Sequence, residues 1–205
     1  MNKFLSLATC ALLALGVSSC CNKNGCENTN QTASGASCLE VIKNRTSIRQ
    51  YTDQPVEKEK IDNLLRAGLA APSAMNKQPW KLVALTNKAK IKELGDSTSK
   101  PPITKSTLTI IVCGDMTKTS GNADDLWWTE DCGAVTENIL LAATAQGLGA
   151  VWCGTWPDPN RFNKVREVLG LPGNLVPYSM IAIGYPAENP APKDKYTEDN
   201  IIRIE

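Results

Sequence analysis

The sequence reads Arg45-Thr46-Ser47-Ile48-Arg49 in one short segment and Ala71-Pro72-Ser73-Ala74-Met75-Asn76-Lys77-Gln78-Pro79-Trp80 in another. The first segment places two guanidinium groups four residues apart with two hydroxyl groups between them, a set of donors suited to an anionic ligand. The second is a proline-bounded loop of small polar residues that cannot continue a helix, so its backbone groups are free to bond a planar polar molecule. Together the two segments predict a site for a planar ligand that carries a phosphate.

The composition narrows the class of protein. The chain has 205 residues, 42% of them hydrophobic, which is enough for one full domain core. Its formal net charge is +1 without a block of basic residues, so nucleic acid is not an expected partner. The chain has no histidine, which excludes a Ser-His-Asp or Cys-His nucleophile, a histidine-ligated zinc site and an imidazole base. We predict no metal site and no catalytic side chain, and we expect a cofactor to carry the chemistry.

The first 19 residues are typical of an export signal. Lys3 precedes an apolar run over residues 4–17, too short to span a bilayer but suited to a signal peptide. The following Val17-Ser18-Ser19-Cys20 resembles a bacterial lipobox, whose cysteine is lipidated after cleavage. We therefore predict an exported lipoprotein anchored to a membrane through Cys20. An ordinary signal peptide or an uncleaved anchor is the alternative.

The sequence after the signal divides into a tether and one folded domain. Residues 20–36 contain almost nothing that could pack in a core, which predicts a flexible tether. Residues 37–205 form the predicted domain. Of the eight cysteines, Cys113 lies in an apolar strand and is expected to be a small buried side chain. Pairing among the cysteines in or next to the tether stays open, and these are Cys21, Cys26 and Cys38.

The order of predicted helices and strands indicates an α+β fold. Ser37 to Glu40 fits a capping box for a helix that leads to Arg45. Further helices are predicted at about 57–70, 88–94, 131–146 and 159–169, and strands at about 80–85, 107–113, 150–153 and 178–184. The apolar run 107–113 suits a strand that is covered on both faces. Gly147-Leu148-Gly149 precedes a strand, so it is not a dinucleotide-binding fingerprint.

From about Leu39 onwards the chain resembles the nitroreductase family of flavoproteins. The matching pieces follow the family's order and are Arg45-x-Ser47-x-Arg49, Pro72-Ser73-x-x-Asn76-x-Gln78-Pro79-Trp80, Asp131 with its long helix, Gly147-Leu148-Gly149-Ala150-x-Trp152-x-Gly154, Ile183-Gly184-Tyr185-Pro186-Ala187 and a late basic pair. The resemblance implies a central, mainly antiparallel sheet flanked by helices. It also implies an intertwined homodimer with FMN at the subunit interface.

The resemblance assigns roles to individual residues. Four are implied to meet the FMN phosphate: Arg45, Ser47, Lys193 and Lys195. Arg49 would lie near the pyrimidine edge of the flavin, with Thr46 beside it in the same segment. A loop from the partner subunit would contribute Pro72, Ser73, Ala74, Met75 and Asn76, and backbone contacts near the reactive nitrogen would come from Trp152, Cys153 and Gly154. A solvated tail is the alternative for the two late lysines.

Two positions stay undecided at the level of sequence. Another flavin contact is expected within residues 99–105, where spacing does not distinguish Lys100 from Lys105. The region 121–128 is the expected substrate pocket. Its adjacent Trp127 and Trp128 either stack on an aromatic substrate or cap the core.

The implied activity is a two-step exchange through FMN. NAD(P)H reduces the flavin, and a nitroaromatic or quinone acceptor then takes the electrons. Because free NAD(P)H is scarce outside the cytoplasm, a non-nicotinamide donor is one alternative. A dehalogenase or flavin-fragmenting enzyme is another, and a lipid-anchored flavin-binding protein without turnover is the third.

Overall fold

The centre of the fold is a four-stranded sheet in the order β1-β2-β4-β3, in which every neighbouring pair is antiparallel. The computed structural model describes residues 37–119 and 126–205. The strands are β1 (Trp80–Leu85), β2 (Leu108–Asp115), β3 (Gly149–Gly154) and β4 (Leu175–Gly184). β2 and β4 are therefore the central strands, and β1 and β3 form the two edges.

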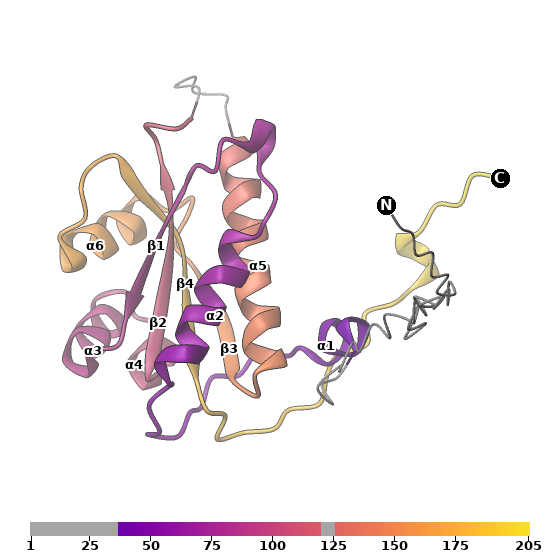
Figure 1. Cartoon of the computed structure of the whole chain (residues 1–205), viewed down its shortest axis with the longest axis horizontal. Coiled ribbons are helices and arrows are strands. Elements are labelled where there is room, and N and C mark those ends of the chain that lie inside the picture. The colour runs from indigo at the N-terminus through magenta and orange to yellow at the C-terminus, as the bar shows by residue number, and fades with distance from the viewer. Residues whose placement is uncertain (1–36, 120–125) are drawn as a thin grey trace, which may run out of the picture. The chain divides into compact units, whose positions relative to one another are not determined.

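Helices cover both faces of this sheet, as Figure 1 shows. One face carries α2 (Lys58–Leu69) and α5 (Trp127–Ala145), and the other carries α3 (Lys88–Ser97), α4 (Pro101–Lys105) and α6 (Pro159–Leu169). Before the sheet comes the short helix α1 (Cys38–Asn44), and single 3₁₀ turns lie at Ala74–Asn76 and Glu198–Asn200. The α+β prediction with a flanked antiparallel sheet is confirmed.

The core is divided by the sheet into two clusters. Ile110 and Val112 of β2 pack in the cluster that contains the α2 and α5 side chains, while Ile111 and Cys113 pack with those of α3, α4 and α6. Successive residues of a strand point to opposite faces, so a continuous apolar run is what a doubly covered strand requires. Cys113 is fully buried, as predicted, and burial raises the pKa of its thiol to about 12.

The capping box at the start of α1 is confirmed, and three helices differ from the prediction. The Glu40 N–H donates to Ser37 Oγ, and the Ser37 N–H donates back to the Glu40 carboxylate. α3 ends at Ser97, three residues later than predicted. α5 begins at Trp127, four residues earlier than predicted, and no side-chain cap marks this start. Burial of Trp128 in the core decides it instead. The sequence did not predict α4 either, because five residues are too few to show a helical period.

The predicted export segment lies outside the described residues. This applies to the signal peptide over residues 1–19, the lipidation site Cys20 and the tether over residues 20–36. Within residues 37–119 and 126–205, none of the helices has the length and apolar character needed to cross a membrane.

Residues 45–52, which we call the strap, run as extended chain beside the edge strand β3. The Ile48 N–H donates to the Ala150 carbonyl at 3.0 Å, and Ser47 forms a parallel bridge with Ala150. Ile48 lies so close to Gly149 that a Cβ there would be 2.6 Å from Ile48 Cγ2. The strap can approach β3 this closely because residue 149 is glycine.

Tyr51 holds the strap against β4. Its hydroxyl donates to the Ile48 carbonyl at 2.5 Å, and the Ala182 carbonyl lies 3.1 Å away as a second acceptor. Beyond this point the strap bonds the chain that leaves β4, where the Thr52 N–H donates to the Tyr185 carbonyl at 2.9 Å. Burial raises the pKa of Tyr51 well above its ordinary value of 10.0, so the hydroxyl keeps its proton in the folded state.

Replacing Tyr51 by Phe is expected to lower the free energy of unfolding at pH 7 by about 1 kcal/mol, because buried carbonyls lose their donor. Since the pKa is raised in the folded state, the wild-type stability is complete below pH 10 and decreases as the pH rises above it. The variant lacks this decrease, so the difference shrinks in urea titrations at higher pH. The exposed Tyr196→Phe is the control, with a change below about 0.5 kcal/mol. Identical pH profiles for wild type and Tyr51→Phe would contradict the assignment.

Candidate functional site

The strap brings three of the predicted phosphate and flavin ligands to one side of an extended segment. Alternate residues of extended chain point the same way, so Arg45, Ser47 and Arg49 share a side, while Ile48 is buried on the other. Thr46 is half-buried between them. Arg45 follows the last residue of α1, and its Nε lies 3.4 Å from Glu137 Oε1 on α5. The motif thus lies on one extended segment, and its role in binding an anion stays a prediction.

The end of β3 leaves open backbone next to the strap. In the described part of the chain, the outer edge of β3 has its bridge to the strap at Ala150 and no paired strand further along. Trp152 and Gly154 are half-buried, and a Cβ on Gly154 would meet nothing within 4 Å. The edge of this segment is therefore unpaired in the described chain, and the flavin contacts that the resemblance implies for it stay a prediction.

Two cations influence Cys153 of β3. Burial raises the pKa of the Cys153 thiol, and the positive charges of Lys100 and Arg49 act in the opposite direction. Lys105 contacts the strap, where its Nζ donates to Gln50 Oε1 at 3.0 Å. The choice between the two lysines as a flavin contact stays a prediction. An open cavity of about 390 Å³ beside α3 and α4 is lined by both lysines.

The loop over residues 71–79 has an unusual backbone. Met75, Asn76 and Gln78 have φ values of 52°, 54° and 50°, in the left-handed region that residues other than glycine seldom adopt. Inside the loop the Gln78 N–H donates to Ser73 Oγ at 2.9 Å. From outside, Asp131 Oδ1 on α5 accepts the Ala74 N–H at 2.8 Å. Such strain is retained where the surrounding structure enforces it, often at a functional site.

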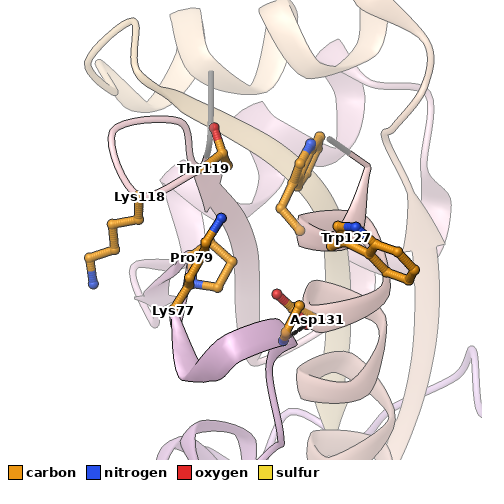
Figure 2. Close-up of a pocket in the computed structure, with 8 residues that line it drawn as sticks. Lys77, Pro79, Lys118, Thr119, Trp127 and Asp131 are labelled. Atoms are coloured by element: carbon orange, nitrogen blue, oxygen red, sulfur yellow. Dashed lines mark hydrogen bonds between the residues drawn. The ribbon is translucent and has the colours of Figure 1, made fainter. Parts of the chain in front are cut away.

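Figure 2 shows a small pocket between this loop and the start of α5. Its lining residues are Ala74, Lys77, Pro79, Lys118, Thr119, Trp127, Trp128 and Asp131. The two tryptophans differ: Trp128 is 5% exposed with its ring 4.9 Å from that of Trp156, whereas Trp127 is 57% exposed. Trp128 therefore caps the core, and Trp127 remains the candidate for substrate contact. Residues 120–125 of the predicted substrate region lie outside the described residues.

The strap and the loop contact α5 at different points. They contact α5 at Glu137 and Asp131 respectively, which are six residues apart. At 3.6 residues per turn, this spacing separates the two contacts by about 120° around the helix and about 9 Å along it. The two halves of the predicted ligand site thus lie on different sides of α5.

The structure does not bring the two late lysines to Arg45. Lys193 and Lys195 are exposed on extended chain, and neither makes a hydrogen bond or ion pair with any residue that the structure describes. The tail approaches the strap earlier, where the Glu188 carboxylate accepts the N–H groups of Arg49 and Gln50. The role implied for the lysines stays a prediction.

Sequence reasoning missed two acidic residues on α5 that organise the site. Glu137 pairs with Arg45, and Asp131 bonds the loop at Ala74. Asp131 is one of the residues that carry the family resemblance, but the sequence indicated no role for it. For Asp131 the sequence did offer a signal, because it lies on the same face of α5 as the buried Val135 and Ile139. A carboxylate is rarely buried on such a face without a partner, so a bonding role could have been predicted.

Comparisons of both sequence and structure with known proteins point to one family. The family model described as "Nitroreductase family" matches residues 42–106 and 99–185. A protein of Archaeoglobus fulgidus, provisionally named as an NADH dehydrogenase/NAD(P)H nitroreductase, is 39% identical over 164 residues, which cover 80% of this chain and 91% of that protein.

Two solved structures are similar over the same region. A Bacteroides thetaiotaomicron protein with the same provisional name superposes with a TM-score of 0.77 at 40% identity, over 83% of this chain and 98% of that one. A provisionally named nitroreductase from Desulfovibrio desulfuricans in complex with FMN gives 0.71 at 28% identity, again over 83% and 98%. From the sequence match, the fold and the order of its motifs, this chain belongs to the nitroreductase family.

Proposed function

We propose that the protein is an FMN-dependent oxidoreductase that takes electrons from NAD(P)H and passes them to a nitroaromatic or quinone acceptor. The observation that carries the proposal is the strap, which collects Arg45, Ser47 and Arg49 beside the open end of β3. The names of the relatives support it, because the Desulfovibrio structure contains FMN and the Archaeoglobus name includes NAD(P)H.

The residues present fit FMN in charge and shape. Arg45 and the Ser47 hydroxyl offer charge-assisted hydrogen bonds to a phosphate. Arg49 and Lys100 place two positive charges near Cys153, where a fixed cation stabilises the negative charge of a reduced ring. The space next to Gly154 leaves room for a flat group against the backbone. When bound, FMN would supply the redox chemistry, and these side chains would bind and orient it.

The purified protein is expected to be yellow and to lose its flavin absorbance when NADH or NADPH is added in a stopped-flow instrument. Arg45→Ala should weaken FMN binding about tenfold or more, because a charge-assisted hydrogen bond to the phosphate is lost. Arg161→Ala on α6 is the matched control, since Arg161 is exposed and pairs with Asp158.

Protein that takes up no FMN would refute the proposed cofactor. Bound flavin that neither NADH nor NADPH reduces would instead indicate a different electron donor. Equal FMN affinity for wild type and Arg45→Ala would contradict the role of the strap.

We also propose that the site is completed in a homodimer. Support comes from the different sides of α5 on which the strap and the loop lie, so that a second copy must bring the missing half. The tail also exposes large apolar side chains, with Ile202 and Ile204 90% and 95% exposed. Exposed apolar chain of this kind is typical of an arm that packs on a partner.

The double variant Ile202→Asp/Ile204→Asp is expected to shift the protein from dimer to monomer in sedimentation velocity, because the charged side chains resist burial at an interface. Asp199→Lys in the same exposed tail is the control and should remain dimeric. A wild-type protein that sediments as a monomer at micromolar concentration would rule out the dimer.

We further propose that the protein is an exported lipoprotein. The support is the sequence of residues 1–20, with an apolar run that ends in Val17-Ser18-Ser19-Cys20. Cys20→Ser is expected to move the protein from the membrane fraction to the soluble fraction after cell breakage, because the lipid attachment site is lost. Cys38→Ser, an exposed cysteine in the folded domain, is the control. Wild-type protein in the soluble fraction would contradict the anchor.

A further inference from the structure

We propose that Asp131 is a positioning residue that holds the loop over residues 71–79 in the conformation that binds FMN. This inference rests on the proposed function. Asp131 is 6% exposed, and its Oδ1 accepts the Ala74 N–H at 2.8 Å. Figure 2 shows its side chain directed from α5 towards the loop. The carboxylate is thus engaged with a loop that is 57 residues away in the sequence.

The loop needs an external support because its backbone is strained. Met75, Asn76 and Gln78 all have positive φ. Each of these residues reaches a more relaxed conformation if the turn is released. Two hydrogen bonds inside the loop define the shape of the turn. They run from Asn76 N–H to the Ser73 carbonyl and from Gln78 N–H to Ser73 Oγ, so they do not fix the position of the turn in the protein.

Asp131 fixes the position of the turn through a hydrogen bond to the turn itself. Among the described residues, the hydrogen bond that reaches the turn Ala74–Asn76 from outside the loop is the one to Asp131. Other external bonds attach the two ends of the loop, from the Ala71 N–H to the Gly68 carbonyl at its start and from Lys118 Nζ to the Gln78 carbonyl and Asp115 N–H to the Pro79 carbonyl at its end. Loss of Asp131 therefore frees the residues implied to contact FMN while the end of the loop stays attached to β2.

The support for Asp131 is rigid. It lies on α5, where the adjacent Cys132 and, one turn later, Val135 are fully buried in the core. A carboxylate accepts a stronger hydrogen bond than a neutral group does, and burial shields this one from competing water. The side chain thereby connects the position of the loop to the packing of the sheet.

The first test compares FMN affinity, measured by quenching of flavin fluorescence, in three variants. Asp131→Ala should bind FMN about tenfold more weakly, because the loop is no longer positioned. Asp131→Asn keeps an oxygen acceptor for the Ala74 N–H, so its affinity should stay within about threefold of wild type. Glu130→Ala removes a neighbouring exposed carboxylate from the same helix and should have no effect.

The second test removes the donor instead of the acceptor. Ala74→Pro lacks the N–H, and proline is compatible with the extended conformation of Ser73 and with the first position of the turn. It leaves α5 intact, so it remains informative if Asp131→Ala does not fold. The double variant Asp131→Ala/Ala74→Pro should bind FMN no more weakly than the weaker single variant, because both changes break the same bond.

Hydrogen exchange of the FMN-free protein separates this inference from the proposed function. We expect faster exchange at the amides of residues 74–77 in Asp131→Ala than in wild type or Glu130→Ala. Wild-type protein without FMN binding would refute the proposed cofactor, while exchange would still test the hold of Asp131 on the loop. Unchanged exchange in Asp131→Ala, or effects of the two single variants that add, would overturn the inference.

Discussion

The helix α5 connects both halves of the site to the core, because it contacts each of them through an acidic side chain. Its apolar side packs against the sheet with Val135 and Ile139 fully buried, so the helix cannot shift without disrupting the core. Glu137 meets Arg45 of the strap, and Asp131 meets Ala74 of the loop. The angle between these contacts follows from helical geometry alone. The same geometry places the two contacts on different sides of the helix.

The strain in the loop sets a limit on how firmly a single chain can hold it. A residue other than glycine in the left-handed region costs on the order of 1–3 kcal/mol, and the loop contains three. A hydrogen bond to a charged group contributes about 1.5–3 kcal/mol, which is comparable with one such residue. The bond from Ala74 to Asp131 therefore cannot offset the whole strain. The other hydrogen bonds of the loop, such as those from Gln78 N–H to Ser73 Oγ and from Lys118 Nζ to the Gln78 carbonyl, must contribute as well.

The local parts of the fold were predictable because they repeat within a few residues. The strand Trp80–Leu85 has the predicted bounds, and the apolar run at 107–113 led to the doubly covered β2. The strap residues were identified because Arg45 and Arg49 lie four residues apart with two hydroxyl groups between them, which is a local pattern as well. A period, a cap or a proline is visible in the sequence itself.

The remaining parts depend on contacts between distant residues. The early start of α5 is decided by burial of Trp128 and has no cap to announce it. The opposite fates of Trp127 and Trp128 follow from their places on the helix, which adjacent identical residues do not reveal. The hydrogen bond from Lys105 to Gln50 also requires the folded chain. Sequence patterns identified these residues, and only the three-dimensional arrangement shows their contacts.

The two edge strands of the sheet differ in how their outer edges are protected from pairing. An uncovered edge strand invites pairing with other chains, and proteins usually block it. On β1 the exposed Lys81 provides a charge of the kind that discourages such pairing. On β3 the strap covers the beginning of the edge, and the backbone from Trp152 to Gly154 is left open. The positive charges of Arg49 and Lys100 act on Cys153 of the same segment, so the proposed function expects an anionic ligand here and not another strand.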